Sequence, residues 1–121
     1  MDELKAEIQQ LMAAAGTDLS FESLMERFCE ALKSHPEALG ALSGRYRLKT
    51  TDTGLSVAFE LAENSFRMLD ASERADAVLS GGEKDLIAMI RRELTPAKAM
   101  FTGRLKVEGS LALLSRFAQI L

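Results

Sequence analysis

The segment 75–121 constrains the fold most, because ordered patterns fill it and it carries almost no reactive side chain. Glycine and proline separate stretches of alternating apolar residues, typical of strands, from apolar spacing typical of helices. So much order with so little chemistry predicts a function of enclosing something apolar. The patterns predict, in this order, a strand, two helices, a strand and a terminal helix, over residues 75–80, 83–93, 96–101, 104–108 and 110–121.

The preceding part of the chain predicts helices first and then an antiparallel group of strands. Apolar residues at helical spacing predict helices over 2–15 and 20–34, and Pro36 opens a short helical turn that ends at Leu42. From Gly44 the apolar period changes to two, and a short turn joins two alternating stretches into a hairpin. Strands are predicted over residues 45–50, 55–61 and 65–70.

Length and composition exclude several classes of protein. A chain of 121 residues that is 47% hydrophobic and 27% charged predicts one globular domain. The net charge is −3, and Arg91 and Arg92 form the only adjacent pair of basic residues, so we expect no nucleic-acid partner. A single cysteine excludes an internal disulfide, and the sequence shows neither a membrane-spanning run nor a secretory leader. We therefore expect a cytoplasmic protein.

Catalytic and metal-binding patterns are absent from the sequence. Cys29 lies in an apolar stripe, where a thiol is commonly a small core residue, and the one histidine, His35, stands at a helix end before a proline. Gly81 and Gly82 lack the spacing of a phosphate loop, and Glu83 after them would repel a phosphate, so a plain turn is expected. We expect no enzyme activity, no metal site and no cofactor.

The terminal helix is apolar over more than one face. Only Ser115, Arg116 and Gln119 form a polar stripe on it. A helix of this kind must be covered on most sides. The sequence leaves three covers open: the core, a partner subunit, or a bound apolar ligand. The apolar positions are Leu111, Leu113, Leu114, Phe117, Ala118, Ile120 and Leu121.

The order of these features resembles the sterol carrier protein-2 (SCP2) family of small lipid-carrier domains. The resemblance covers residues 20–121, so residues 1–16 are expected to add one helix to a single domain, 1–121. The segment 21–42, followed by Gly44, is similar to the family's first long helix and the start of its first strand. The more specific matches are Ala75-Asp76 before a strand, the helical stretch 85–88, the helix start Thr95-Pro96, the residues 99–101, and the block GRLKVEG at 103–109.

The resemblance implies an α+β fold in which helices cover one face of a five-stranded, mostly antiparallel sheet and enclose an apolar tunnel. It also implies binding of fatty acids, fatty acyl-CoA, phospholipids or sterols without chemical change. The residue patterns agree with a three-stranded meander followed by two strands joined through helices. For that connection we expect a right-handed crossover that places the fourth and fifth strands parallel.

From this resemblance we predict non-catalytic carriage or presentation of a lipid that lies between sheet and helices. The alternative is a protein-interaction or dimerisation module, or an accessory subunit of a lipid- or quinone-biosynthesis enzyme, with little or no ligand cavity. The expected partner is a lipid or fatty acyl ligand; transient membrane contact and a homodimer through the terminal helix stay open. The predicted tunnel-lining residues are Phe28, Leu32, Phe59, Phe66, Met89, Met100, Phe101, Leu105, Leu113 and Phe117.

Overall fold

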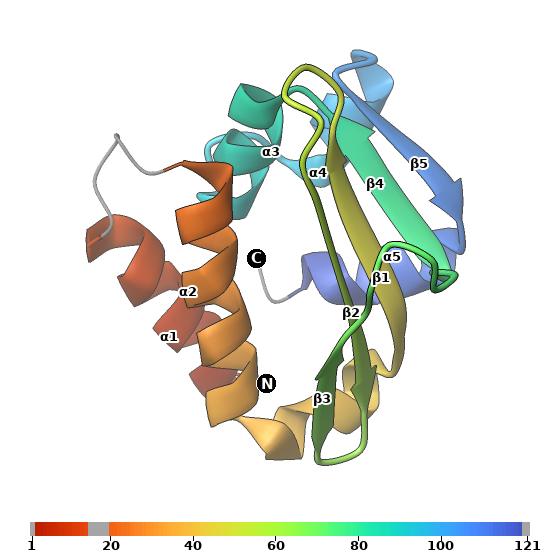
Figure 1. The fold of residues 1–121 in the computed structure, drawn as a ribbon. Coiled ribbons are helices and arrows are strands. Elements are labelled where there is room, and N and C mark those ends of the chain that lie inside the picture. The colour runs from red at the N-terminus through yellow and green to blue at the C-terminus, as the bar shows by residue number, and fades with distance from the viewer. Residues whose placement is uncertain (1, 15–19, 120–121) are drawn as a thin grey trace.

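The computed structural model describes residues 2–14 and 20–119, and all the predicted helices and strands are present in it (Figure 1). The predicted positions Ala15, Ile120 and Leu121 lie outside the described residues. The helices are α1 (Asp2–Ala14), α2 (Phe21–Ser34), the 3-10 helix η1 (Pro36–Leu42), α3 (Glu83–Ile90), α4 (Pro96–Phe101) and α5 (Leu111–Ala118). The strands are β1 (Gly44–Thr50), β2 (Ser56–Ala62), β3 (Ser65–Met68), β4 (Ala77–Gly81) and β5 (Leu105–Gly109).

Three helices begin at a hydroxyl residue of the kind that caps helices. The side chains of Ser20, Thr95 and Ser110 each accept a hydrogen bond from the backbone N–H three residues later. These bonds satisfy donors that the first turn of a helix leaves without a partner. The starts of α2, α4 and α5 are therefore fixed by local sequence.

The sheet has the strand order β3-β2-β1-β4-β5. The hairpin of β1 and β2 is antiparallel, as predicted, with Tyr46 opposite Phe59 and Leu48 opposite Val57. This register places apolar side chains of both strands on one face. β3 adds to β2 antiparallel, whereas β4 lies parallel to β1 on the other side, which gives a mixed sheet.

The prediction that the fourth and fifth strands are parallel was wrong, because β4 and β5 pair antiparallel with Gly81 opposite Leu105. The connection between them holds α3 and α4, and both lie near the end of the sheet at which β4 finishes (Figure 1). β5 therefore starts at that same end and runs back along β4. A parallel pair would have needed a connection that returns to the opposite end of the sheet.

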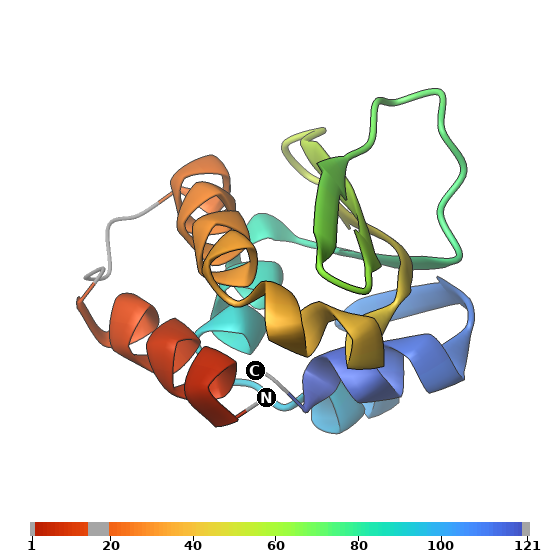
Figure 2. The ribbon, with the colours of Figure 1, turned by 90° about the horizontal axis from the view of Figure 1, so that it is seen from below.

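The helices lie together on one side of the sheet, and the segment between β3 and β4 loops out on the other side (Figure 2). This arrangement confirms the predicted α+β fold with one covered face. The core lies between the two layers and includes residues from every helix and from four of the strands, such as Phe28, Tyr46 and Phe117. α1 packs beside α2, and its Leu4 and Ile8 are completely buried.

Candidate functional site

A cluster of aromatic rings occupies the space between the helices and the sheet. Phe117 of α5 is its centre, with ring centroids 4.8 Å from Tyr46, 5.5 Å from Phe28 and 6.0 Å from Phe59. Phe66 of β3 stacks on Phe59 at 5.8 Å and extends the cluster toward the sheet edge. Contacts of this kind stabilise beyond the area that they bury. The cluster joins α2, α5 and three strands in one apolar interior.

Tyr46 brings the one polar group into this cluster. Its hydroxyl donates a hydrogen bond of 2.6 Å to the carbonyl oxygen of Leu42, in a buried environment. Burial raises the pKa of Tyr46 to about 12, so the hydroxyl stays neutral and acts as a donor. Tyr46 therefore anchors the end of η1 to the sheet and offers no chemistry of its own.

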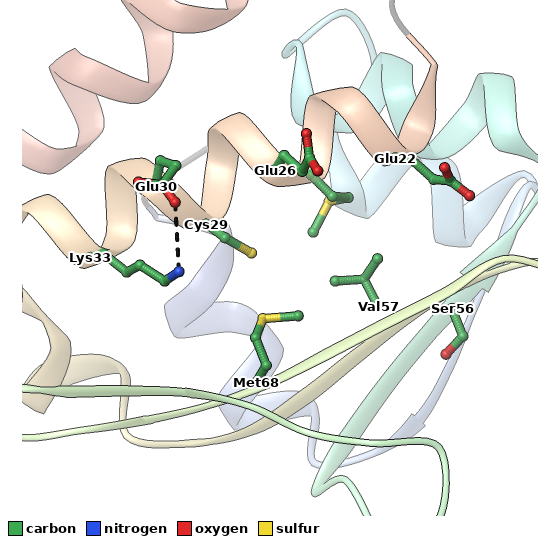
Figure 3. Close-up of a pocket in the computed structure, with 9 residues that line it drawn as sticks. Glu22, Glu26, Cys29, Glu30, Lys33, Ser56, Val57 and Met68 are labelled. Carbon is green, nitrogen blue, oxygen red and sulfur yellow. Dashed lines mark ion pairs between the residues drawn. The ribbon is translucent and has the colours of Figure 1, made fainter.

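A groove of about 620 Å³ opens between α2 and the β2–β3 edge of the sheet (Figure 3). Met25 and Cys29 line it from α2, and Val57 and Met68 line it from β2 and β3. Figure 3 shows Cys29, Val57 and Met68 pointing toward one another across the groove. Its volume falls in the range of small-molecule sites, roughly 300–1,000 Å³. We call this feature the α2 groove; it is also lined by Glu22, Glu26, Glu30, Lys33 and Ser56.

The thiol of Cys29 belongs to the apolar floor of the α2 groove. Cys29 is 6% exposed, and burial raises the pKa of its thiol to about 11 against the opposing effect of Lys33. Because the thiolate is the nucleophile, the neutral thiol is inert near pH 7. The structure agrees with the sequence interpretation of Cys29 as a small core residue.

The rim of the α2 groove is acidic. Glu22, Glu26 and Glu30 follow one another at four-residue intervals and are exposed on α2. The one rim cation, Lys33, pairs with Glu30 at 3.6 Å and also lies 5.2 Å from the centroid of the Phe66 ring. Three carboxylates against one ammonium leave the rim with a net negative charge near neutral pH.

A second opening lies between α4 and α5. It measures about 370 Å³ and is mainly apolar, with Met100 on one side and Leu114 and Ala118 on the other. These three residues also line a small apolar void of about 30 Å³ that reaches Phe117. That volume corresponds to about one water molecule. This opening, the α4–α5 groove, therefore leads toward Phe117 in the aromatic cluster.

Most of the ten residues predicted to line a tunnel lie in the interior. Phe28, Phe59, Phe66 and Phe117 meet in the aromatic cluster, and Met89 and Met100 line the small void with Phe117. Leu32, Leu105 and Leu113 are buried core residues. Phe101 is 92% exposed and Met100 is 40% exposed, so the structure places Phe101 on the surface.

The sequence interpretation did not select the residues that line the α2 groove. None of Met25, Cys29, Val57 and Met68 was among the ten. Met25 and Cys29 stand one helical turn apart beside a stripe of glutamates, which is the pattern of a helix edge that faces an opening. That pattern indicates an edge, but which strands face it depends on how α2 packs.

Several polar groups outside the grooves connect helices and strands. The His35 ring places Nε2 3.0 Å from a Glu7 carboxylate oxygen and Nδ1 3.2 Å from one of Glu37. A carboxylate oxygen of Glu3, a ring nitrogen of His35 and a carboxylate oxygen of Glu37 lie within 4.8 Å of one another. These contacts join α1 to the end of α2, which the sequence did not reveal. At the other end of the sheet, Asp52 accepts a hydrogen bond from the Glu83 N–H and occupies the start of α3. Over residues 2–14 and 20–119, no helix has the length and apolar character needed to cross a membrane.

Comparisons with known proteins agree on one family. A family model described as the SCP-2 sterol transfer family matches residues 21–121, which leaves α1 outside the matched region. A comparison with curated protein sequences found no match.

Solved structures with a similar fold include two SCP2 proteins and part of an alkylsulfatase. The UbiJ-SCP2 ubiquinone synthesis protein is 16% identical over 83% of this chain and 95% of its own, with a TM-score of 0.65. The palmitated SCP2L2 of Aedes aegypti is 20% identical over 84% of this chain and 94% of its own, with a TM-score of 0.61. The sec-alkylsulfatase Pisa1 of Pseudomonas sp. is 18% identical over 80% of this chain but only 16% of its own, with a TM-score of 0.64. Identities this low establish a shared fold.

Proposed function

The chain belongs to the SCP-2 sterol transfer family, and we propose that it binds and carries a lipid without changing it chemically. The observation that supports this proposal most is the α2 groove, which opens beside an aromatic interior and has a volume of about 620 Å³. One structural neighbour is palmitated, so an acyl chain can be held by this fold. In this chain the apolar part of the lipid would lie against Met25, Cys29, Val57 and Met68.

Burial of the apolar chain would drive binding. Each methylene removed from water contributes about 0.8 kcal/mol, so a chain of about 16 carbons gains on the order of 12 kcal/mol before the costs of ordering are subtracted. The interior is closely filled, with a void of only about 30 Å³ beside Phe117. A long chain would therefore displace side chains as it enters, and the flexible side chains of Met25, Met68 and Met100 suit that adjustment. Of the ten residues predicted to line the tunnel, all but the exposed Phe101 remain proposals for how far the chain extends.

The acidic rim selects among lipid classes. A carboxylate or phosphate at the mouth would face Glu22, Glu26 and Glu30, while Lys33 already pairs with Glu30. Like charges repel one another, and here the repulsion is modest because the rim groups are exposed to solvent. We therefore favour lipids with an uncharged head, such as sterols, over fatty acids and acyl-CoA.

A displacement titration tests this proposal. An NBD-labelled octadecyl probe is displaced from the protein by 1-octadecanol or by stearate, two ligands that share a chain and differ in head charge. We expect saturable binding and displacement by the alcohol at lower concentration, by roughly threefold to tenfold. Glu26→Gln should reduce that preference, because it removes one rim charge.

A matched pair of variants locates the binding. Val57→Trp places a large ring in the α2 groove, whereas Val78→Trp changes another half-buried strand valine that lies beside Arg47 and Glu108 in a polar basin. Val57→Trp should weaken the binding of the NBD-labelled probe and of octadecanol, whereas Val78→Trp should not. Thermal unfolding shows whether both variants fold. Absence of saturable binding for every lipid would favour the alternative, an interaction module or an accessory subunit. The structural likeness to a ubiquinone synthesis protein supports that alternative.

A further inference from the structure

The surface around α4 and the start of α5 exposes large apolar side chains. Four such side chains are exposed among the described residues, and three of them lie here: Phe101 at 92%, Leu111 at 61% and Met100 at 40%. Met100 and Leu111 line the α4–α5 groove, whose walls are mainly apolar, and Phe101 follows Met100 on α4. Scattered single apolar residues are normal on protein surfaces, but a cluster beside an apolar groove marks an interaction site. We call this surface the α4–α5 face.

The segment that includes this face carries mostly positive charges. The segment 95–119 holds four basic residues and one acidic residue, a net charge of +3, although the whole chain has a net charge of −3. Lys98 lies one helical turn before Phe101, so the two side chains are neighbours on the surface of α4. Lys98, Arg104 and Arg116 are exposed, and within residues 2–14 and 20–119 none of them forms an ion pair with a carboxylate.

We propose that the α4–α5 face docks on the surface of an anionic membrane. Exposed aromatic and aliphatic side chains would enter the boundary between head groups and acyl chains, as on amphipathic surface helices. Lys98 beside Phe101, and Arg104 just after α4, would lie at the level of the anionic head groups, where each basic residue adds attraction. Exposed apolar side chains with basic residues beside them suit both the apolar interior and the negative surface of such a membrane.

The acidic rim of the α2 groove supports this orientation. Glu22, Glu26 and Glu30 form a negative edge on α2, and a negatively charged membrane repels such an edge. In Figure 2, α2 lies at the upper side of the molecule and α4 lies at the lower side, beside α5. The negative charge of the membrane would therefore orient the α4–α5 face toward the membrane and leave the acidic rim of the α2 groove in water.

A second copy of the chain fits this face less well. In a two-fold dimer the same patch meets itself, so Lys98 and Arg104 of one copy would be brought toward the basic residues of the other. Such like-charge contacts disfavour association. The membrane is the partner that supplies the missing negative charge.

The docked face would also lie over a path to the interior. Met100, Leu114 and Ala118 line both the α4–α5 groove and the small void that reaches Phe117. An apolar chain leaving the membrane would meet these residues first. Docking itself does not rest on the lipid-binding function of the α2 groove, because the two surfaces share no residue.

Vesicle flotation tests the proposal. The protein is mixed with vesicles of phosphatidylcholine alone or of equal parts phosphatidylcholine and phosphatidylglycerol. We expect binding to the anionic vesicles, little binding to the neutral ones, and loss of binding as salt is raised. Phe101→Ser should weaken vesicle binding by about tenfold, because one buried aromatic side chain is lost from the contact. Lys98→Glu should weaken it by about tenfold or more, because it replaces an attraction with a repulsion.

Met68→Ser is the matched control. Met68 is 49% exposed, comparable to the residues of the α4–α5 face, but it lies at the α2 groove. Met68→Ser should leave vesicle binding unchanged but weaken the binding of octadecanol in the displacement titration. Failure of docking and failure of lipid binding are thereby told apart. Phe101 is almost fully exposed, so Phe101→Ser keeps the fold. Vesicle binding that Phe101→Ser leaves unchanged would overturn the proposal. So would a concentration-dependent dimer that Phe101→Ser abolishes, since it would assign the face to a second copy.

Discussion

Two glycines, one shortly before β5 and one at its end, show how single residues specify this fold. Gly103 and Gly109 both have positive φ angles, 77° and 86°, which favour glycine over residues with a side chain. A Cβ atom at Gly103 would meet nothing within 4 Å, whereas one at Gly109 would overlap the carbonyl oxygen of Asp76. Gly103 is therefore needed for its backbone angle alone, and Gly109 for its angle and for the close approach of the chain before β4.

This difference predicts unequal costs for the same substitution. Gly103→Ala should lower the free energy of unfolding by about 1 kcal/mol, the strain of an L-residue at positive φ. Gly109→Ala should cost more, about 3 kcal/mol or above, because the backbone must also move away from Asp76. Urea unfolding of both variants measures the two costs. Equal destabilisation would show that the contact with Asp76 does not restrict this position.

Single residues also mark the limit of sequence interpretation. The caps Ser20, Thr95 and Ser110 can be recognised from the sequence, because capping depends on a few neighbouring residues. Phe101 was predicted to line a tunnel, yet it is 92% exposed. In a helix as short as α4, the inward direction is set by what it packs against rather than by periodicity.

At the scale of elements, ion pairs connect three strands across the open face of the sheet. Glu60 of β2 accepts hydrogen bonds from Arg45 of β1 at 2.8 Å and from Arg67 of β3 at 3.3 Å, and Arg67 also donates to Glu73 at 3.0 Å. The bond from Arg45, and then that from Arg67, hold the pKa of Glu60 below its ordinary value of 4.5. The backbone N–H of Asp70, and then Arg67, likewise lower the pKa of Glu73.

These lowered pKa values predict acid sensitivity. A carboxyl group whose pKa is lower in the folded state contributes stability above its unfolded pKa, and that stability is lost as the pH falls through the folded pKa. The melting temperature should therefore fall as the pH drops below 4.5, and Glu60→Gln should reduce the difference between pH 7 and acid. Glu63→Gln is the control, because Glu63 is exposed and forms no ion pair among residues 20–119. An unchanged pH dependence in Glu60→Gln would contradict this account.

Elements differ in how far the sequence could place them. Their identities and order follow from local patterns, and the hairpin of β1 and β2 follows from a short turn between two alternating stretches. The direction of β5 does not, because two short helices can return a chain to either end of a sheet. The face of α2 toward the sheet edge was likewise beyond the sequence, and with it Val57 and Met68 of the α2 groove.

At the scale of the whole molecule, the protein combines an apolar interior with two surfaces of opposite charge. The aromatic cluster around Phe117 holds the helices to the sheet. The α2 groove has an acidic rim, and the α4–α5 face has exposed basic residues such as Lys98. The sequence predicted this interior because apolar surface is in excess and chemistry is scarce. The openings depend on tertiary packing, so the sequence could not place them.

The only cysteine of the chain gives the most direct test of the central claim, that a lipid occupies the α2 groove. Cys29 lines that groove, and the pKa of its thiol is about 11, so its reaction with methyl methanethiosulfonate can be followed at alkaline pH without any substitution. With 1-octadecanol at a concentration that displaces the NBD-labelled probe, we predict that the rate of Cys29 modification falls severalfold. A rate that stays unchanged while the lipid is fully bound would place the ligand elsewhere and contradict the account.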